Sequence, residues 1–322
     1  MKTVLAGLVA ATALVSAAQA QQQIVVAHAI SPTSHFGLGA DAFIQTLTEL
    51  SGGAFTGEQA PNSQLGGERD MIEGLQIGSI DVVITSSGPL GNFVPEVLVL
   101  DLPFLFRDYD HARTTLDGEI GRELLDRVDE NDLVGLAWSD HGFRHLTNSQ
   151  RPVATPEDLA GLKLRTMENR VHMEAFSGLG AAPTPMAWPE VFTSLQLGVI
   201  DGQENPMPVL TSTGIWEVQQ YVSLTGHVYS PGIILASPFL WDGLSEEERG
   251  WFLEAARAGV QATRDEVDRM EAAGVEMLRE NGMTVITDID RAPFAAVAAE
   301  AAYHIFTDRF GNELVERIIA VE

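Results

Sequence analysis

The sequence predicts an α/β fold that is divided into two lobes. Strand and helix patterns alternate over the first part of the chain, which is typical of a layered sheet with covering helices. A helical pattern then runs without proline from Ser245 to about Asn281, which is far longer than an average helix. Because one lobe of a chain of 322 residues is too small for such a helix, we expect it to span both lobes.

The first twenty residues resemble a secretory signal peptide and not a part of the fold. Lys2 supplies a positive start, residues 5–15 are apolar, and Ala18-Gln19-Ala20 offers small residues at the cleavage site. The apolar run is too short for a membrane span. We therefore expect cleavage before Gln21 and a soluble exported protein located in the periplasm.

Composition excludes several classes of function. The chain has no cysteine, which rules out thiol catalysis and thiolate metal sites. Its net charge is −26, and cleavage of the leader would remove Lys2 and bring it to −27. So acidic a surface repels nucleic acid and anionic lipid. A basic side chain within an apolar segment is therefore expected to have an anionic partner.

The elements before residue 100 follow the order strand, helix, strand, helix, strand. We expect them at 23–28, 36–50, 54–60, 68–76 and 81–85. This order favours a mostly parallel sheet. Gly37-Leu38-Gly39-Ala40-Asp41-Ala42 matches a relaxed dinucleotide-binding fingerprint, but its glycines fall inside a helix and not in a tight turn after a strand. We reject a dinucleotide site for this reason.

The later elements are less regular. A helical region over 108–128 is expected to break near Asp117-Gly118, and the strand over 133–138 continues through 142–146 into the second lobe. We then expect strands over 161–166, 221–225, 232–236 and 283–286, and helices over 189–197, 291–306 and 312–321. Ser245 and Glu248 form a capping box at the start of the long helix.

Two arginines lie in strand-like settings. In residues 161–166, Leu162 and Leu164 point to one face and Arg165 to the other, so Arg165 faces a cleft or solvent if the leucines face a core. Arg144 has a similar setting. A guanidinium binds a carboxylate through two parallel hydrogen bonds. For both arginines the alternative is an internal salt bridge.

A stiff segment and a polar segment follow Arg165. Prolines at 183, 185 and 189 restrain the chain around Trp188, which suits a pocket wall or simple packing within the lobe. Residues 201–206 are interpreted as a polar turn, in which Asn205 offers both donor and acceptor groups. For Asn205 the alternative is ordinary turn chemistry.

Enzyme motifs are missing from the sequence. It has no nucleophile elbow, phosphate-binding loop or H-E-x-x-H pair, and its eight histidines are dispersed. A catalytic group assembled from distant positions stays open. From this pattern we expect no enzyme activity, no cofactor and no metal.

Taken together, these segments resemble the DctP-type solute-binding proteins of TRAP transporters. The resemblance rests on residues 162–169 (LKLRTMEN) and 180–206 (GAAPTPMAWPEVFTSLQLGVIDGQENP), supported by 63–86, DLPFLF at 101–106 and GFRHLTNS at 142–149. It covers essentially the whole mature chain. It implies a periplasmic-binding-protein-like fold whose two lobes close over a ligand, with the long helix packed along both.

The resemblance also implies roles for particular residues. Arg165 matches the arginine that pairs with a substrate carboxylate, Asn205 helps to hold that group, Trp188 lines the site, and Arg144 matches a second anion-contacting arginine. Further expected ligand contacts are His28, His35, Ser86 and Ser87 from the first lobe and Glu168, Asn169 and His172 from the second. We place the first lobe at 21–142 plus about 231–270, and the second at 143–230 plus about 271–322.

The implied function is that of a monomeric periplasmic receptor. It would bind a small organic acid, with a dicarboxylate or a hydroxylated or sugar acid favoured, and deliver it to the membrane subunits of a TRAP transporter. Two alternatives stay open at this point. One is an exported enzyme acting on organic acids, and the other is a sensory receptor that presents its ligand to a membrane kinase.

Overall fold

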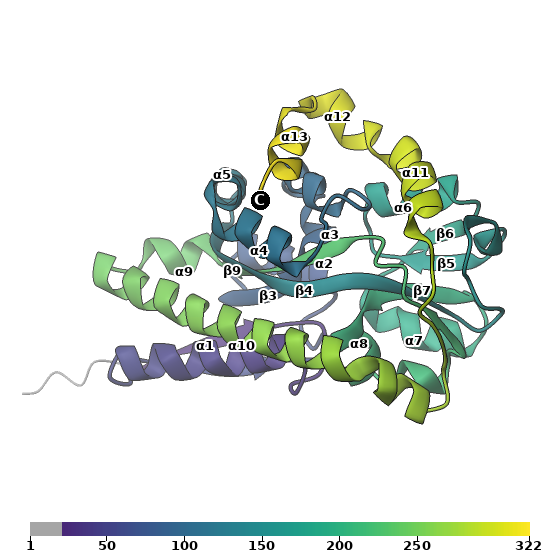
Figure 1. Ribbon diagram of the computed structural model, residues 1–322. Helices are drawn as coiled ribbons and strands as arrows, with labels where there is room; N and C mark the ends of the chain where they lie inside the picture. Colours follow the sequence, from purple (N-terminus) through teal and green to yellow (C-terminus); the bar gives the residue numbers. More distant parts are fainter. Residues whose placement is uncertain (1–20) are drawn as a thin grey trace, which may run out of the picture.

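The computed structural model describes residues 21–322, and the predicted signal peptide lies outside these residues. Ten strands form one continuous sheet, whose main path runs β2-β1-β3-β9-β4-β7-β5-β6 (Figure 1). The strands are β1 (Gln22–Ala27), β2 (Phe55–Ala60), β3 (Val82–Ser86), β4 (Val134–Asn148), β5 (Lys163–Thr166), β6 (Ala182–Pro185), β7 (Gly202–Pro206), β8 (Tyr221–Ser223), β9 (Tyr229–Ala236) and β10 (Thr284–Ile286).

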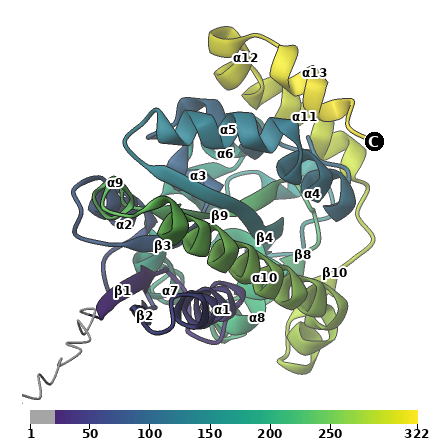
Figure 2. The same ribbon diagram turned by 90° about the vertical axis from the view of Figure 1, so that its left-hand side faces the viewer.

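Helices cover both faces of this sheet (Figures 1 and 2). The α-helices are α1 (His35–Leu50), α2 (Glu68–Gln76), α3 (Ser87–Leu90), α4 (Tyr109–Asp117), α5 (Glu119–Asp129), α6 (Arg170–Gly178), α7 (Trp188–Gln196), α8 (Met207–Ser212), α9 (Pro238–Asp242), α10 (Glu246–Glu280), α11 (Arg291–Ala302), α12 (His304–Phe310) and α13 (Glu313–Ile319). Three 3₁₀ turns complete the described elements: η1 (Pro95–Asp101), η2 (Pro156–Leu159) and η3 (Ile215–Glu217).

Strand β4 joins the two lobes. Residues 134–143 pair antiparallel with β9, and residues 144–148 pair with β7 and β8. We call the part with β1, β2, β3 and β9 the first lobe, and the part with β5, β6, β7, β8 and β10 the second lobe. Since β4 is one strand of 15 residues, it carries the sheet from one lobe into the other without a break.

The long helix α10 also spans both lobes, as the sequence predicts. Ser245 accepts a hydrogen bond from the Glu248 backbone, and the Glu248 carboxylate accepts one from the Ser245 backbone, so the predicted capping box is present. Along its length α10 packs first on α1 and β4 in the first lobe, and then on α8 and β10 in the second (Figure 2).

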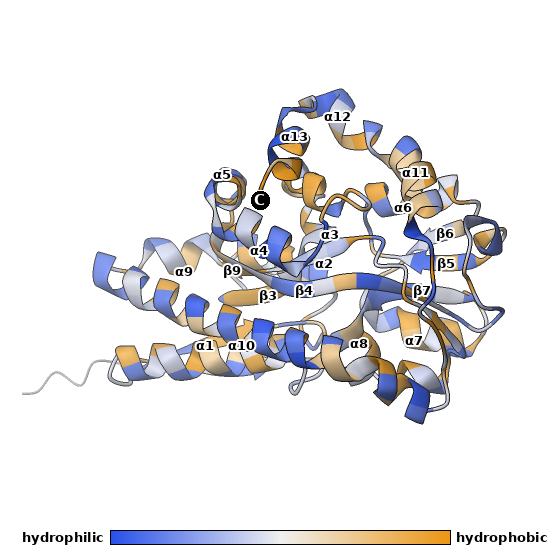
Figure 3. Cartoon of the chain, in the orientation of Figure 1, coloured by the Kyte–Doolittle hydropathy of each residue, from blue (hydrophilic) through white to orange (hydrophobic). Residues whose placement is uncertain are grey.

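The packing of α10 on α1 needs glycine at the contact. A Cβ atom added to Gly39 would lie 2.4 Å from Thr263 Oγ1 and 3.1 Å from the Gly259 carbonyl oxygen. The glycines of the rejected dinucleotide fingerprint therefore include one that packs α1 against α10. Apolar side chains such as Phe43 and Phe252 complete this core, whereas many outward positions of α10 are hydrophilic (Figure 3).

One expectation from the sequence is wrong, and two other features of the sheet were not visible in it. Residues 202–206 are not a polar turn but the buried strand β7, which pairs with both β4 and β5. The parallel order expected for the first three strands is present, since β1 pairs in parallel with β2 and β3, whereas β9 and β4 run antiparallel to their neighbours at the centre and make the whole sheet mixed. Residues 182–185 form the edge strand β6, where two prolines are tolerated because an edge strand can leave backbone donors unpaired.

The C-terminal segment reaches from the second lobe to the first. Helix α11 packs on α6, whereas α13 is held by contacts with α4 and α5. These include an Arg317–Glu123 ion pair at 2.7 Å and a hydrogen bond of 2.8 Å between His111 Nε2 and the Ile318 carbonyl oxygen. The residue boundaries that we expect between the lobes stay a prediction. Over residues 21–322, no helix combines the length and apolar character that crossing a bilayer requires.

Candidate ligand-binding site

A cavity lies between the two lobes and brings together three of the residues that the sequence singles out. Arg165, Trp188 and Asn205 line it from the second lobe. The remaining lining residues are Ala29, Ile30, Phe36, Glu68, His141, Met167 and Val209. The cavity has room for about 20 Å³ of water, which is enough for a single molecule. An organic acid therefore requires the lobes to part or the lining to shift.

Arg165 is buried, and no carboxylate among residues 21–322 pairs with it. It lies on β5 opposite the face that carries Leu162 and Leu164, both of which are buried in the core. Its Nε and Nη2 donate to the Met186 carbonyl oxygen, at 2.9 and 2.7 Å. Burial lowers the pKa of the Arg165 guanidinium to about 10, so it stays charged at neutral pH. Within the described residues it takes part in no ion pair, which leaves its charge available to an anion.

Trp188 stands beside this guanidinium. It is the first residue of α7, and Pro189 follows in the first helical turn, where its missing N–H costs nothing. The Arg165 guanidinium lies 5.8 Å from the centre of the Trp188 ring, within the range of a cation–π contact. The half-buried Trp188 thus forms a wall of the cavity and holds the charge in place.

Asn205 is oriented by its neighbours on β4 and β7. Its Oδ1 accepts a hydrogen bond of 3.3 Å from Arg144 Nη2, and its Nδ2 donates to Gln203 Oε1. An amide nitrogen carries two hydrogens. One N–H of Asn205 therefore remains for a ligand, and the amide is fixed with this donor side available.

Arg144 does not line the cavity. It forms a buried ion pair with Glu204, in which Nη2 donates to Oε1 at 2.9 Å, and this is the internal salt bridge that the sequence left open. His227 Nε2 lies 3.1 Å from the same carboxylate. Burial alone would raise the pKa of Glu204, but the charge of Arg144 and the hydrogen bond from His227 hold it well below its usual range. Direct contact of Arg144 with a ligand stays a prediction.

Glu68 is a site residue that the sequence reasoning missed. It begins α2, and its Oε1 accepts three hydrogen bonds, from Thr85 Oγ1, the Ser86 backbone and Ser86 Oγ, at 2.8–2.9 Å. Its second oxygen has no partner among the described residues, and the residue lines the cavity. A signal was available, since the glutamate directly follows Gly66-Gly67 at the start of a helix.

His28 and His35 do not line the cavity, and ligand contact by them stays a prediction. His28 Nε2 lies 2.9 Å from Gln59 Oε1, and His35 Nε2 lies 2.9 Å from His141 Nδ1. Neither His28 nor His35 lines the cavity, whereas His141 does. Burial lowers the pKa of His28 and His141, and that of His35 to about 3, so all three are neutral at physiological pH.

The other five expected contacts do not line the cavity either. Ser86 supports Glu68, as described above. Ser87 and Asn169 both donate to the buried Asp101 carboxylate, at 2.9 and 2.8 Å, and His172 Nε2 lies 3.5 Å from it. The Glu168 carbonyl accepts from Asn92. These residues connect α3 and η1 of the first lobe with α6 of the second, and ligand contact by them stays a prediction.

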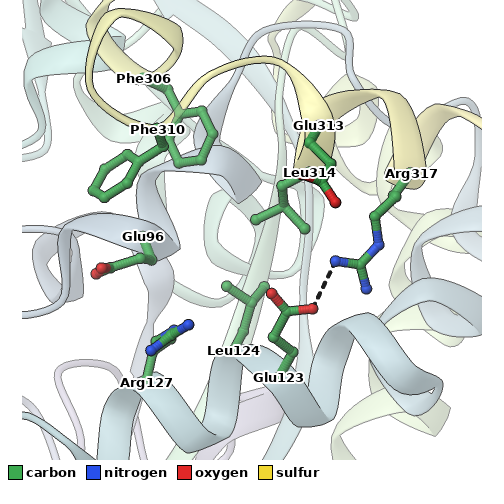
Figure 4. A pocket seen from close by; sticks show the side chains of 9 residues that line it. All are labelled: Glu96, Glu123, Leu124, Arg127, Phe306, Phe310, Glu313, Leu314 and Arg317. Atoms are coloured by element: carbon green, nitrogen blue, oxygen red, sulfur yellow. Dashed lines mark ion pairs between the residues drawn. The ribbon is translucent and has the colours of Figure 1, made fainter.

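A second hollow, of about 240 Å³, lies on the surface between α5 and the C-terminal helices (Figure 4). Its two arginines already have carboxylate partners: Arg317 pairs with Glu123 at 2.7 Å, and Arg127 pairs with Glu130 at 2.8 Å. Its lining also includes Glu96 and Glu313. This hollow therefore offers an anion no unpaired positive charge, unlike the cavity at Arg165.

The cavity can bind a small anion that also carries polar oxygens. Arg165 and Asn205 provide donors for a carboxylate, and Glu68 provides an acceptor for a hydroxyl group. Residues 21–322 contain no cluster of three side chains that could hold a metal ion.

Comparison with known proteins agrees with this chemistry. The family profile described as "Bacterial extracellular solute-binding protein, family 7" (DctP) matches residues 26–308. A solute-binding protein of Verminephrobacter eiseniae is 46% identical over 303 residues, which cover 94% of this chain and 90% of the relative.

Two solved structures are similarly close. A TRAP periplasmic solute-binding protein of Polaromonas sp. JS666, bound to D-erythronate, has a TM-score of 0.92 and 46% identity, covering 94% of this chain and 99% of the other. One from Bordetella bronchiseptica, with density interpreted as pantoate, has a TM-score of 0.91 and 49% identity, covering 94% and 100%.

Proposed function

Because the chain belongs to family 7 of the bacterial extracellular solute-binding proteins, we propose that it is a periplasmic receptor for a small hydroxylated carboxylic acid. It delivers this acid to the membrane subunits of a TRAP transporter. It binds and releases the acid without changing it. The observation that carries the proposal is Arg165, a charged guanidinium that is buried between the lobes and takes part in no ion pair within residues 21–322.

The cost of burying the Arg165 charge favours a ligand that carries a carboxylate. Burying a cation is costly unless an anion compensates it. A ligand carboxylate at Arg165 and Asn205 would gain charge-assisted hydrogen bonds, each worth about 1.5–3 kcal/mol. The cation–π contact with Trp188 restrains the guanidinium beforehand, which reduces the entropy lost on binding.

Hydroxyl groups are favoured by Glu68. A second carboxylate on the ligand would be repelled by the free oxygen of Glu68, whereas a hydroxyl group could donate to it. The two structural relatives support this choice, because D-erythronate and pantoate are both monocarboxylic acids with hydroxyl groups at C2 and C4. We therefore favour a hydroxylated monocarboxylate over a dicarboxylate.

Binding and lobe motion are linked in this proposal. The cavity has room for only about 20 Å³ of water, so the ligand enters while the lobes are apart and is enclosed when they close. Closure can be driven only by contacts that are better in the closed state than in the open one. Contacts between the lobes, such as Asn169 with Asp101 at 2.8 Å, add to those of the ligand.

Calorimetry with matched ligands tests the proposal. We expect D-erythronate or pantoate to bind, because each presents both a carboxylate and hydroxyl groups. Erythritol, which has the hydroxyl groups without the carboxylate, and butyrate, which has the reverse, are expected to bind at least about 100-fold more weakly. Equal affinity for erythritol and erythronate would contradict the carboxylate assignment, and stronger binding of succinate would contradict the role given to Glu68.

The same samples separate a receptor from an enzyme. After long incubation with excess ligand, proton NMR is expected to show the acid unchanged. Steady conversion of the acid at a rate proportional to protein concentration would favour the alternative of an exported enzyme.

A further inference from the structure

His141 occupies an irregular position in the strand that joins the lobes. On β4, Asp140 pairs with Pro231 and Gly142 with Ser230 of β9, so that His141 is left without a partner in a β-bulge. Gly142 has φ of +124°, a conformation that favours glycine. A β-bulge changes the direction in which a side chain points, and bulges are common next to functional sites. This one turns the His141 ring toward the cavity that Arg165 also lines.

The ring is held tightly by its surroundings. Phe36 stacks on it with ring centres 4.9 Å apart, and His35 Nε2 lies 2.9 Å from its Nδ1. Its Nε2 makes no hydrogen bond within residues 21–322, and part of this nitrogen stays accessible to water. Since the residue lines the cavity, Nε2 is the ring atom that a bound ligand can reach.

The contact between the two histidines decides which nitrogen of each ring carries the proton. Exactly one of the two facing nitrogens must donate, because both rings are neutral. If His141 Nδ1 donated, His35 would carry its proton on Nδ1, which is enclosed and has no hydrogen-bond partner. The favoured arrangement therefore has His35 Nε2–H donating to His141 Nδ1.

We propose that His141 is a specificity-determining residue that donates a hydrogen bond from Nε2 to a ligand oxygen outside the carboxylate, in the tautomer that His35 selects. This inference rests on the proposed function, since it assigns a further contact in the same cavity. It gives the site a fixed donor in addition to the acceptor at Glu68. Together they favour a hydroxyl group, which can both accept and donate, over an apolar substituent.

The tautomer can be measured without changing the protein. We expect ¹⁵N NMR of the wild-type protein to show His141 with a protonated Nε2 and an unprotonated Nδ1, and His35 with the same tautomer. A protonated Nδ1 on His141 would make Nε2 an acceptor and would overturn the proposal. This readout needs neither a ligand nor a variant that must fold.

Binding tests the contact itself. For the hydroxy acid that the wild-type protein binds, His141→Phe is expected to weaken binding about 10- to 100-fold, since phenylalanine retains the stack on Phe36 and removes the donor. His141→Gln, which restores an N–H near the position of Nε2, is expected to recover part of this loss. Unchanged affinity in a folded His141→Phe variant would overturn the proposal.

A double-mutant cycle with monodeoxy analogues of the same acid identifies the oxygen involved. The analogue that lacks the oxygen contacted by His141 is expected to bind the wild-type protein and His141→Phe equally well. In that analogue the hydrogen bond is already missing, so removal of the histidine costs nothing more. If every analogue loses the same factor in the variant, His141 acts through the shape of the cavity and the proposal is wrong. If the wild-type protein binds no hydroxy acid at all, the proposed function fails first, so the two failures can be told apart.

Discussion

At the scale of single residues, the two buried arginines differ in what compensates their charge. Arg144 has a permanent carboxylate partner in Glu204, and this pair also orients Asn205. Among the described residues, Arg165 contacts the Met186 carbonyl oxygen and the face of Trp188 and forms no ion pair. Uncompensated buried charge raises the free energy of the unliganded protein, and an anionic ligand relieves this cost. Affinity for a carboxylate therefore follows from the charge of Arg165, which takes part in no ion pair within residues 21–322.

The sequence predicts some of these residues and not others for physical reasons. Arg165 could be found because the alternation of a strand places it opposite two core leucines. Trp188 could be found because prolines restrain its segment. His141 could not, since its position depends on a bulge, and a one-residue irregularity reverses which face a side chain meets. For Glu68 the sequence shows only a place at the start of a helix, because its role in the site depends on hydroxyl groups of a distant strand.

At the scale of secondary-structure elements, the contact between α1 and α10 sets how the long helix lies on the first lobe. Gly39 and Gly259 allow the two helices to approach closely, and Thr263 Oγ1 fills the remaining space by donating to the Gly259 carbonyl oxygen at 2.8 Å. A methyl group at Gly39 has no room, so the helices would have to move apart.

Substitution of Gly39 tests this packing. We expect Gly39→Ala to lower the free energy of unfolding by about 1–3 kcal/mol, because the added Cβ overpacks the helix contact. Gly250→Ala is the matched control, since Gly250 lies in an exposed turn of α10 with no atom within 4 Å of an added Cβ. That change is expected to stabilise the protein by about 0.5–1 kcal/mol through helix propensity. Urea denaturation that ranks the two variants in the opposite order would contradict the account.

Element prediction succeeded for strongly periodic helices and apolar strands, and failed for a buried strand made of polar residues. The long helix and its capping box follow from the sequence, because an amphipathic pattern and a local cap are both visible in it. Strand β7 was mistaken for a turn because Gly202-Gln203-Glu204-Asn205-Pro206 is polar throughout. Its polar side chains are buried and satisfied by partners such as Arg144 and Thr147, which lie about 60 residues earlier in the chain.

At the scale of the whole molecule, buried neutral histidines make folding sensitive to acid. Burial lowers the pKa of five of them: His28, His35, His141, His145 and His227. For His35 and His145 the folded pKa is about 3. In the unfolded chain these groups bind a proton near pH 6.5, so below that pH the unfolded state takes up more protons than the native state.

Stability is therefore expected to fall as the pH decreases. The contribution of these histidines is complete above pH 6.5 and is lost progressively toward pH 3, which is the direction required for a base whose pKa is depressed on folding. Between pH 7 and pH 5 we expect the free energy of unfolding to drop by more than about 2 kcal/mol. The measurement is urea denaturation in about 1 M salt, which screens repulsion among the acidic surface groups. A free energy that is constant or rises over this range would contradict the assignment of neutral buried histidines.

The central claim is that Arg165 holds the carboxylate of the ligand, and calorimetry of one variant tests it most directly. For the acid that the wild-type protein binds best, we expect Arg165→Met to weaken binding by at least about 100-fold, while its urea denaturation stays cooperative. Arg127→Met, which changes an arginine of the surface hollow, is expected to bind like the wild-type protein. Undiminished affinity in a folded Arg165→Met variant would contradict the account.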